Sequence, residues 1–331
     1  MLRFIALCML SVCIVSACTD GTGERRTYVL TTGTTGGTFY PVGVALSTLV
    51  SALDEADFAL TAISSAGSME NIKLLRDNQG QFGLILAIFA AWAYDGEGPI
   101  RNPQRHIRGI SAMWPNVEHF VLRSDLVTDG TVSDLAKLGG ERYSIGMRNS
   151  GAEQTGFYIF DALGIDYNED LSIAYMGYGP SANALQDGNI VGMNVPAGPP
   201  VTAITRAFAL LGERMTILNF SAEELTAINQ EFPLWNFYEL AAGTYPLQEE
   251  PITTAYSPNV FVVREDVSED IVYNMTKLLW DNLATLQEIH SATKAMAIEE
   301  ALKGIPVPLH PGALRYYQEQ GVEIPEHLLG G

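Results

Sequence analysis

Apolar residues recur along the chain in two different patterns, and the alternation between them predicts an α/β fold. Residues 28–30 have the composition of a strand end, and behind the following loop Val42, Leu46 and Val50 recur at helical spacing. Further along the chain, a predicted strand at residues 142–146 also precedes a loop and a helix. We therefore expect strands that lead through short loops into helices.

Residues 31–43 connect the first predicted strand to the first predicted helix, and Gly33, Gly36 and Gly37 leave the backbone of this loop almost bare. Glycines permit conformations that are closed to other residues and let N–H groups point outward, and Pro41 suits a first helical turn. Because a helix N-terminus adds partial positive charge, the loop suits a carboxylate or a phosphate. The spacing matches neither G-x-G-x-x-G nor the P-loop, and a tight turn of an ordinary α/β protein is the alternative interpretation.

Two further segments combine small residues with the start of a helix. Residues 64–72 lead into Ile72, Leu74 and Leu75, and residues 148–155 form the third loop of this kind. Near the C-terminus, residues 268–283 read as a capped amphipathic helix with an aliphatic core face. The three loops are therefore the candidate binding segments.

The first 26 residues have the pattern of an export signal followed by a tether. Arg3 precedes an uncharged apolar run at residues 4–17, which as a helix would reach only about 20 Å, less than the roughly 30 Å of a bilayer core. Residues 1–17 are therefore interpreted as a signal peptide rather than a membrane helix. Residues 15–18 have the sequence of a bacterial lipobox, which predicts lipidation of Cys18 and a tether at residues 18–26. The alternative is ordinary cleavage near Ala17 without a lipid.

Charge and cysteine content narrow the class of protein. The chain of 331 residues carries a formal net charge of −19, which argues against nucleic acid as a partner. All three cysteines lie at or before Cys18, so the mature chain retains at most one cysteine and can form no internal disulfide. The 47% of hydrophobic residues supplies a substantial core, and the length favours two domains over one.

The sequence contains no pattern of residues that is typical of a catalytic or metal site. The segment around His310 invites a metal or catalytic role, but no second histidine or cysteine stands at ligand spacing, so a structural turn is the better interpretation. No Ser/His/Asp order accompanies a motif such as G-x-S-x-G. We expect no catalytic residues, no metal and no cofactor.

Taken in order, seven segments resemble those of the TAXI family, the solute receptors of TRAP transporters. They extend over almost the whole chain, at residues 33–40, 66–72, 145–151, 184–188, 196–200, 271–277 and 309–317. Each is weak alone, but their order and spacing together are specific. The resemblance implies a two-lobed periplasmic-binding-protein fold of type II-like architecture, with the ligand buried between the lobes.

In receptors of this kind the chain leaves the first lobe by one strand and returns by another. Two similar apolar strands, residues 117–125 and 259–266, are the candidates for these crossover hinge strands. This predicts lobe I at residues 27–120 plus 264–331 and lobe II at residues 121–263, with a short helix from Val132 opening the second lobe. A single large α/β domain is the alternative.

The three loops would then face one another across the cleft and offer hydrogen-bond donors to a small anionic or zwitterionic solute. Phe39, Tyr40 and Tyr178 are expected to line the walls of the cleft. Arg148 or Glu153 is expected to recognise the charge of the solute. The full set of expected ligand-binding residues is Gly36, Gly37, Thr38, Phe39, Tyr40, Ser68, Asn71, Arg148, Ser150, Gly151, Glu153, Thr155, Tyr178, Ala197 and Gly198.

Two departures from the family pattern bear on specificity. Residues 84–89 are apolar where related sequences have a glutamine or serine near the strand end, and Ala152 replaces the common threonine. The pocket is therefore expected to be more apolar than a glutamate site.

The resemblance implies an extracytoplasmic receptor that delivers a small organic acid or an amino acid to an ion-coupled TRAP permease. Export and a lipid on Cys18 would place it in the periplasm, anchored to a membrane. Two other readings of the chain stay open: an enzyme acting on a small acid, and a receptor that signals to a sensor kinase.

Overall fold

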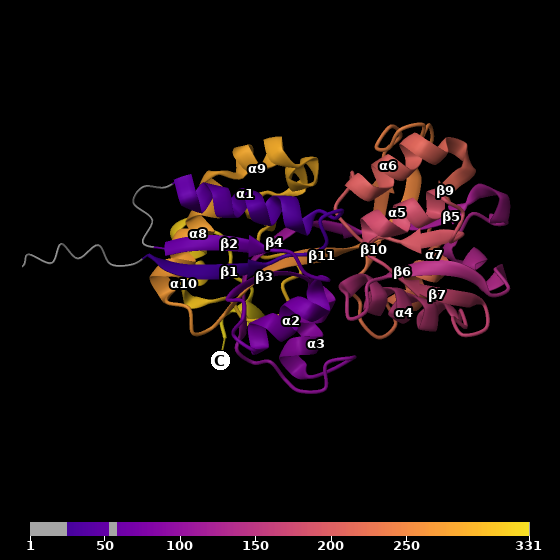
Figure 1. The fold of residues 1–331 in the computed structure, drawn as a ribbon. Coiled ribbons are helices and arrows are strands. Elements are labelled where there is room, and N and C mark those ends of the chain that lie inside the picture. The colour runs from indigo at the N-terminus through magenta and orange to yellow at the C-terminus, as the bar shows by residue number, and fades with distance from the viewer. Residues whose placement is uncertain (1–24, 53–57, 331) are drawn as a thin grey trace, which may run out of the picture.

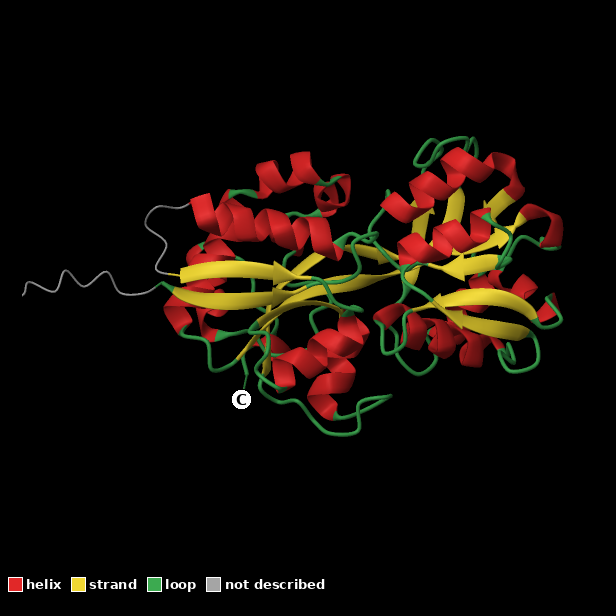
Figure 2. Cartoon of the chain, in the orientation of Figure 1, coloured by secondary structure: helices red, strands yellow, loops and turns green. Residues whose placement is uncertain are grey.

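The computed structural model describes residues 25–52 and 58–330, which form two lobes, each built on a mixed β-sheet (Figure 1). The predicted signal peptide and Cys18 lie outside the described residues. Helices cover both faces of each sheet, so most strands are enclosed on two sides (Figure 2). Within the described residues, no helix is both long enough and apolar enough to cross a bilayer.

The sheet of the first lobe has the strand order β10-β11-β3-β1-β2, with β4 on the other edge of β11. β1 pairs in parallel with β2 and β3, whereas β11 is antiparallel to β3, β4 and β10. The strands are β1 (Arg26–Thr31), β2 (Phe58–Ile63), β3 (Phe82–Leu86), β4 (Ile107–Val117), β10 (Asn236–Leu240) and β11 (Ile252–Arg264).

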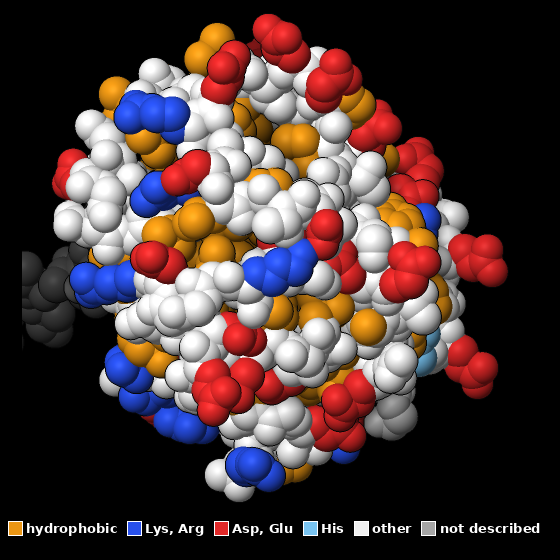
Figure 3. Space-filling view, turned by 90° about the vertical axis from the view of Figure 1, so that its right-hand side faces the viewer, with side chains coloured by type: hydrophobic (Ala, Val, Ile, Leu, Met, Phe, Trp, Pro, Cys, Tyr) orange, Lys and Arg blue, Asp and Glu red, His pale blue; other side chains and the backbone are white. Residues whose placement is uncertain are grey.

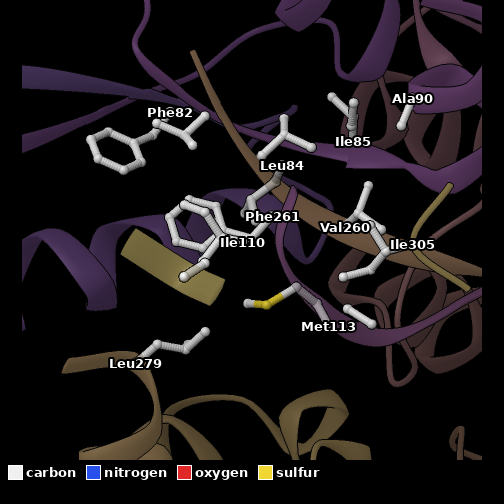
Figure 4. Close-up of a cluster of buried hydrophobic side chains, with 14 of the residues drawn as sticks. Phe82, Leu84, Ile85, Ala90, Ile110, Met113, Val260, Phe261, Leu279 and Ile305 are labelled. Carbon is white, nitrogen blue, oxygen red and sulfur yellow. The ribbon is translucent and has the colours of Figure 1, made fainter. Parts of the chain in front are cut away.

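The helices of the first lobe pack on both sides of this sheet (Figure 1). They are α1 (Phe39–Ala52), α2 (Ser68–Arg76), α3 (Ala87–Asp95), α8 (Glu269–Asp281), α9 (Leu283–Ile289) and α10 (Pro311–Glu319). In the core, the rings of Phe82 and Phe261 lie 5.8 Å apart, and Leu279 of α8 faces Ile110 and Met113 of β4 (Figure 4). Burial of these side chains removes apolar surface from water and holds the sheet to its helices.

The sheet of the second lobe has the strand order β7-β6-β8-β5-β9. Its strands are β5 (Phe120–Arg123), β6 (Glu141–Gly146), β7 (Leu171–Tyr175), β8 (Gly192–Asn194) and β9 (Met215–Ile217). Its helices are α4 (Gly151–Leu163), α5 (Tyr178–Gln186), α6 (Thr202–Leu211) and α7 (Ala222–Ile228). One core cluster lies on the α5 and α6 side and another on the α4 and α7 side.

Two crossover segments join the lobes, as the fold prediction required. The chain leaves the first sheet at the end of β4 and enters the second at β5, and it returns through β10 and the long strand β11. The segments contact each other where they cross, because Glu118 donates its N–H to Ala255 and accepts from the Thr254 hydroxyl. Side chains of β10 and the start of β11 also pack into the core clusters of the second lobe.

Local structure agrees with the expected elements at most points and differs at one. The short helix expected from Val132 is a 3₁₀ helix, Val132–Lys137. Ser268 occupies the N-cap position of α8 without a capping hydrogen bond from its side chain. His310 serves the expected structural role, because its Nδ1 accepts from Gly312 N–H at the N-cap of α10.

The outer end of the second lobe carries acidic side chains across much of its surface, with basic side chains interspersed among them (Figure 3). This distribution follows from the excess of 38 acidic over 19 basic residues in the sequence. Net negative charge of this kind favours solubility.

Candidate functional site

Four helices begin around one cavity between the lobes. The parallel strands of both sheets point their carboxyl ends toward this space, so the loops that enter α1, α2, α4 and α5 converge there. The cavity is lined by Gly33, Thr34, Gly37, Thr38, Phe39, Ala66, Gly67, Ser68, Leu86, Asn116, Gly151, Ala152, Tyr178, Pro196 and Ala197.

The two lobes lie close together around this space. The cavity has a volume of about 30 Å³. A wider mouth of about 830 Å³ opens beside it and shares Thr34, Ala66 and Tyr178 with the cavity. The arrangement is a closed one, with a small chamber behind an open entrance.

The glycines of the first loop allow the two lobes to approach each other closely, and they do not adopt a left-handed backbone conformation. Gly33, Gly36 and Gly37 are absent from the positive-φ residues of the described chain, so the expectation that they need special conformations is not met. A Cβ at Gly37 would instead lie 3.1 Å from Cε2 of Tyr178, and one at Gly36 would lie 3.2 Å from the backbone nitrogen of Gly179. The bare backbone allows the first lobe to touch the second.

The cavity wall offers helix starts but no charged side chain. Within the described residues, its lining contains no Lys, Arg, His, Asp or Glu. Ser68 and Gly151 are the first residues of α2 and α4, and the N–H groups of a first turn have no acceptor inside their own helix. Together with the helix dipoles, these donors favour a bound anion.

Two polar side chains of the lining lack hydrogen-bond partners. Asn116 Nδ2 and Thr34 Oγ1 are buried without a partner, and the Asn116 side chain belongs to a residue that is only 1% exposed. An unsatisfied buried donor costs about 1–3 kcal/mol, so such groups in a cavity wall are expected to meet a ligand or an ordered water. They are independent support for ligand binding at this place.

A buried acid and a buried histidine occupy the hinge next to the cavity. Burial raises the pKa of the Glu118 carboxyl to about 8, and neither of its oxygens has a hydrogen-bond partner. Burial lowers the pKa of His119 to about 4, although its bonds to the carbonyls of Val195 and Val117 oppose the shift. His119 Nε2 also lies 2.7 Å from the Tyr245 hydroxyl. Both ring nitrogens of His119 therefore have hydrogen-bond partners in the protein, whereas the carboxyl oxygens of Glu118 have none.

The sequence profile of the NMT1-like family matches residues 30–321, which is most of the chain. The chain belongs to the NMT1-like family. The match includes all of the loops around the cavity.

Solved structures with the same fold support the two-lobed architecture. MatC (Rpa3494) from Rhodopseudomonas palustris, solved with bound malate, is 13% identical over 89% of this chain and 96% of that chain, with a TM-score of 0.54. The periplasmic binding protein BugD is 12% identical over 91% of this chain and 99% of that chain, with a TM-score of 0.53. This NMT1-like protein thus has the type II periplasmic-binding-protein fold.

The expected ligand-binding residues divide into three groups by position. Seven line the cavity, namely Gly37, Thr38, Phe39, Ser68, Gly151, Tyr178 and Ala197. Gly36 lines the mouth. The others lie outside the cavity lining, namely Tyr40, Asn71, Arg148, Ser150, Glu153, Thr155 and Gly198.

Several residues of the third group hold the loops in place. Asn71 donates to the carbonyls of Thr32 and Leu84, and Thr155 donates to the Gly151 carbonyl. Gly198 joins the lobes, because its carbonyl accepts from the Thr38 hydroxyl at 2.7 Å.

The start of α4 uses its polar side chains in the same way. Ser150 Oγ accepts from Glu153 N–H, and the Glu153 carboxylate accepts from Asn149 N–H. The Arg148 guanidinium stacks 3.7 Å from the centre of the Tyr175 ring. The two residues expected to recognise solute charge therefore serve the helix start and a surface ring in this closed arrangement.

Sequence reasoning missed several residues of the lining. Thr34, Asn116 and Pro196 line the cavity but were not among the expected ligand-binding residues. The sequence did hold a sign of Asn116, since apolar and polar residues alternate at residues 115–118. Leu86 and Ala152, which mark the two departures from the family pattern, both lie in the cavity wall.

Proposed function

We propose that this protein is an extracytoplasmic solute receptor that binds a small carboxylate between its lobes. The observation that carries the proposal is the convergence of four helix starts on a cavity that also holds the unpartnered Asn116 amide. The carboxylate takes N–H bonds from the first turns of α2 and α4, and Asn116 and Thr34 supply side-chain bonds. The apolar Leu86 and Ala152 leave fewer polar contacts than a glutamate site requires.

Lobe movement accompanies binding. Because segments of both lobes line the cavity, the solute enters with the lobes apart and is then enclosed by them. The crossover segments act as the hinge between the lobes. The expected bounds are residues 27–120 plus 264–331 for lobe I and residues 121–263 for lobe II, but β10 and β11 pair within the sheet of the first lobe. A change from mostly open to mostly closed needs about 5.5 kcal/mol of preference for the closed state, which the contacts from both lobes to one solute supply.

The receptor delivers its solute to a TRAP-type permease. The seven segments that resemble the TAXI family support this partner, and the fold is one in which a closed lobe pair presents a combined surface to a membrane protein. The permease, rather than the receptor, supplies the energy of transport from an ion gradient.

Residues 15–18 support export followed by lipid attachment at Cys18. Because each buried CH₂ contributes about 0.8 kcal/mol, several acyl chains hold the receptor at the membrane. Cys18→Ser is expected to move the protein from the membrane to the soluble periplasmic fraction. A wild-type protein that already fractionates as soluble would contradict the anchor.

A thermal-shift screen of small mono- and dicarboxylates, oxo acids and amino acids tests the receptor proposal. A ligand present at about 100 times its dissociation constant stabilises the protein by about 2.7 kcal/mol. Recovered solute is expected to be chemically unchanged after long incubation. Turnover of the solute, or no stabilisation by any acid, would overturn the proposal.

A further inference from the structure

Three buried side chains follow one face of the first crossover segment, and each leaves a polar atom without a partner. Trp114, Asn116 and Glu118 occupy alternate positions, which share a face in an extended strand. The unpartnered atoms are Trp114 Nε1, Asn116 Nδ2 and both carboxyl oxygens of Glu118. These residues are at most 1% exposed. We call this row the polar floor.

The polar floor lies against the cavity. Asn116 lines it directly, and Trp114 packs edge-to-face on Phe39, another residue of the lining, with ring centres 6.1 Å apart. Hydrogen bonds of Val117 with Ala197 and of His119 with Val195 set Pro196 opposite Glu118. Pro196 lines the cavity, so Glu118 lies immediately behind its wall.

The polar floor offers acceptors as well as donors. Asn259, on the neighbouring strand β11, donates its amide nitrogen to the Trp114 carbonyl, which leaves Asn259 Oδ1 as a buried acceptor without a partner. Glu118 adds its carboxyl oxygens. A carboxylate offers acceptors alone, so it satisfies the helix starts and Asn116 but not these oxygens. The solute must bring a donor of its own.

The surroundings favour a neutral donor over a cationic one. Four helices begin around the cavity, and its lining contains no Asp or Glu within the described residues, so an ammonium group would find no carboxylate partner there. Because burial raises the pKa of Glu118 to about 8, its carboxyl keeps a proton at neutral pH. A protonated carboxyl still accepts a hydrogen bond at its carbonyl oxygen.

We propose that the solute carries a hydroxyl group beside its carboxylate, and that Asn116 and Glu118 select for this hydroxyl. The inference rests on the proposed receptor function and narrows its ligand to hydroxy acids. Asn116 donates to the hydroxyl oxygen, and Glu118 accepts from the hydroxyl hydrogen once the solute has entered between the lobes.

Matched acids that differ in one group test the proposal. Dissociation constants are measured by calorimetry at neutral pH for two series, propionate, lactate and alanine, and succinate, malate and aspartate. The hydroxy acid of at least one series is expected to bind about tenfold or more tightly than both its plain and its amino counterpart, as for a buried hydrogen bond gained without an added charge.

Variants then assign the preference to the polar floor. Asn116→Leu and Glu118→Leu are each expected to reduce the ratio between the plain and hydroxy acid dissociation constants toward one. Glu118→Gln retains an acceptor oxygen of the same reach and is expected to keep the ratio. Glu169→Gln, an exposed residue of the second lobe, is the matched control and should change nothing.

The outcomes separate this inference from the receptor function. Equal binding of plain and hydroxy acids, or tighter binding of the amino acid, overturns the hydroxyl proposal while the receptor function stands. A ratio that survives in both leucine variants overturns the role of the polar floor. If no acid of either series binds, the small-carboxylate function itself fails. Should Glu118→Leu not fold, Asn116→Leu and Glu118→Gln still decide the question.

Discussion

At the scale of single residues, Gly37 shows how an absent side chain sets the distance between two lobes. Its Cα faces the Tyr178 ring, and a Cβ would lie 3.1 Å from Cε2 and 3.3 Å from Cδ2 of that ring. Real Cβ contacts are seldom this short, and a β-branched side chain adds two methyl groups in the same space. The residue therefore acts through lobe contact rather than through its own conformation.

Gly37→Val is expected to hold the lobes apart and to weaken solute binding at least about tenfold, with the fold of each lobe retained. Calorimetry gives the affinity and a melting curve checks the fold. Gly179→Val is a matched control, because a Cβ there meets no atom within 4 Å. Unchanged affinity in Gly37→Val would show that the lobe contact is dispensable.

Glu118 makes stability depend on pH. Burial raises its pKa from the ordinary 4.5 to about 8 in the folded protein, so the folded state binds more protons than the unfolded state between these values. Stability is then full below the unfolded pKa and falls as pH rises toward about 8, by up to about 1.4 kcal/mol per pH unit. His119, whose pKa is lowered to about 4, acts in the opposite direction below its ordinary pKa.

Glu118→Gln is expected to remove this fall. Urea midpoints of wild type and variant, measured between about pH 6.5 and about pH 8, should diverge with rising pH in favour of the variant. The chosen window lies above the range in which His119 contributes. Parallel curves would mean that the Glu118 carboxyl has a partner or a lower pKa in solution.

At the scale of elements, the start of α4 illustrates how a helix end serves both stability and binding. Ser150 and Glu153 satisfy N–H groups at its N-terminus with their side chains, while Gly151 and Ala152 line the cavity. The polar side chains therefore stabilise the loop that exposes the bare backbone.

Ser150→Ala is expected to cost about 1 kcal/mol of folding stability, the usual loss for an N-cap serine, and to change solute affinity less than about threefold. Chemical denaturation and calorimetry measure the two quantities. Ser221→Ala removes the equivalent cap of α7, which lies away from the cavity, and should show the same stability loss. A large loss of solute affinity in Ser150→Ala alone would indicate that Ser150 contacts the solute.

Elements were predictable from sequence to the extent that local patterns determine them. The helix starts behind Gly37, Gly67 and Ser150 follow from periodicity and small residues within a dozen positions. Thr34 and Asn116 line the cavity only because segments that are distant in sequence converge there, and a local sequence pattern does not predict this convergence. Short polar groups such as Asn71 bond equally well to backbone or to ligand, so their partner is decided by the tertiary fold.

At the scale of the whole molecule, contacts on two sides of the cavity hold the lobes together. On one side Thr38 donates to the Gly198 carbonyl. On the other, the ring of Trp92 in α3 lies 6.1 Å from that of Tyr158 in α4 and 5.7 Å from that of Phe232. In the proposed closure the lobes move as rigid bodies about the crossover segments, so these contacts favour the closed state.

Phe232→Ala is expected to shift that balance toward the open state. An aromatic pair is worth about 0.5–1.5 kcal/mol, so solute affinity should fall about two- to tenfold while the solute still fits its site. Small-angle scattering should show wild type becoming more compact on saturation, with the variant less compact than wild type before solute is added. Phe237→Ala, on an exposed position of β10, is the control. A radius of gyration that does not change with solute in either protein would exclude hinge closure. Unchanged solute affinity in Phe232→Ala would show that the aromatic contact does not affect the balance between open and closed states.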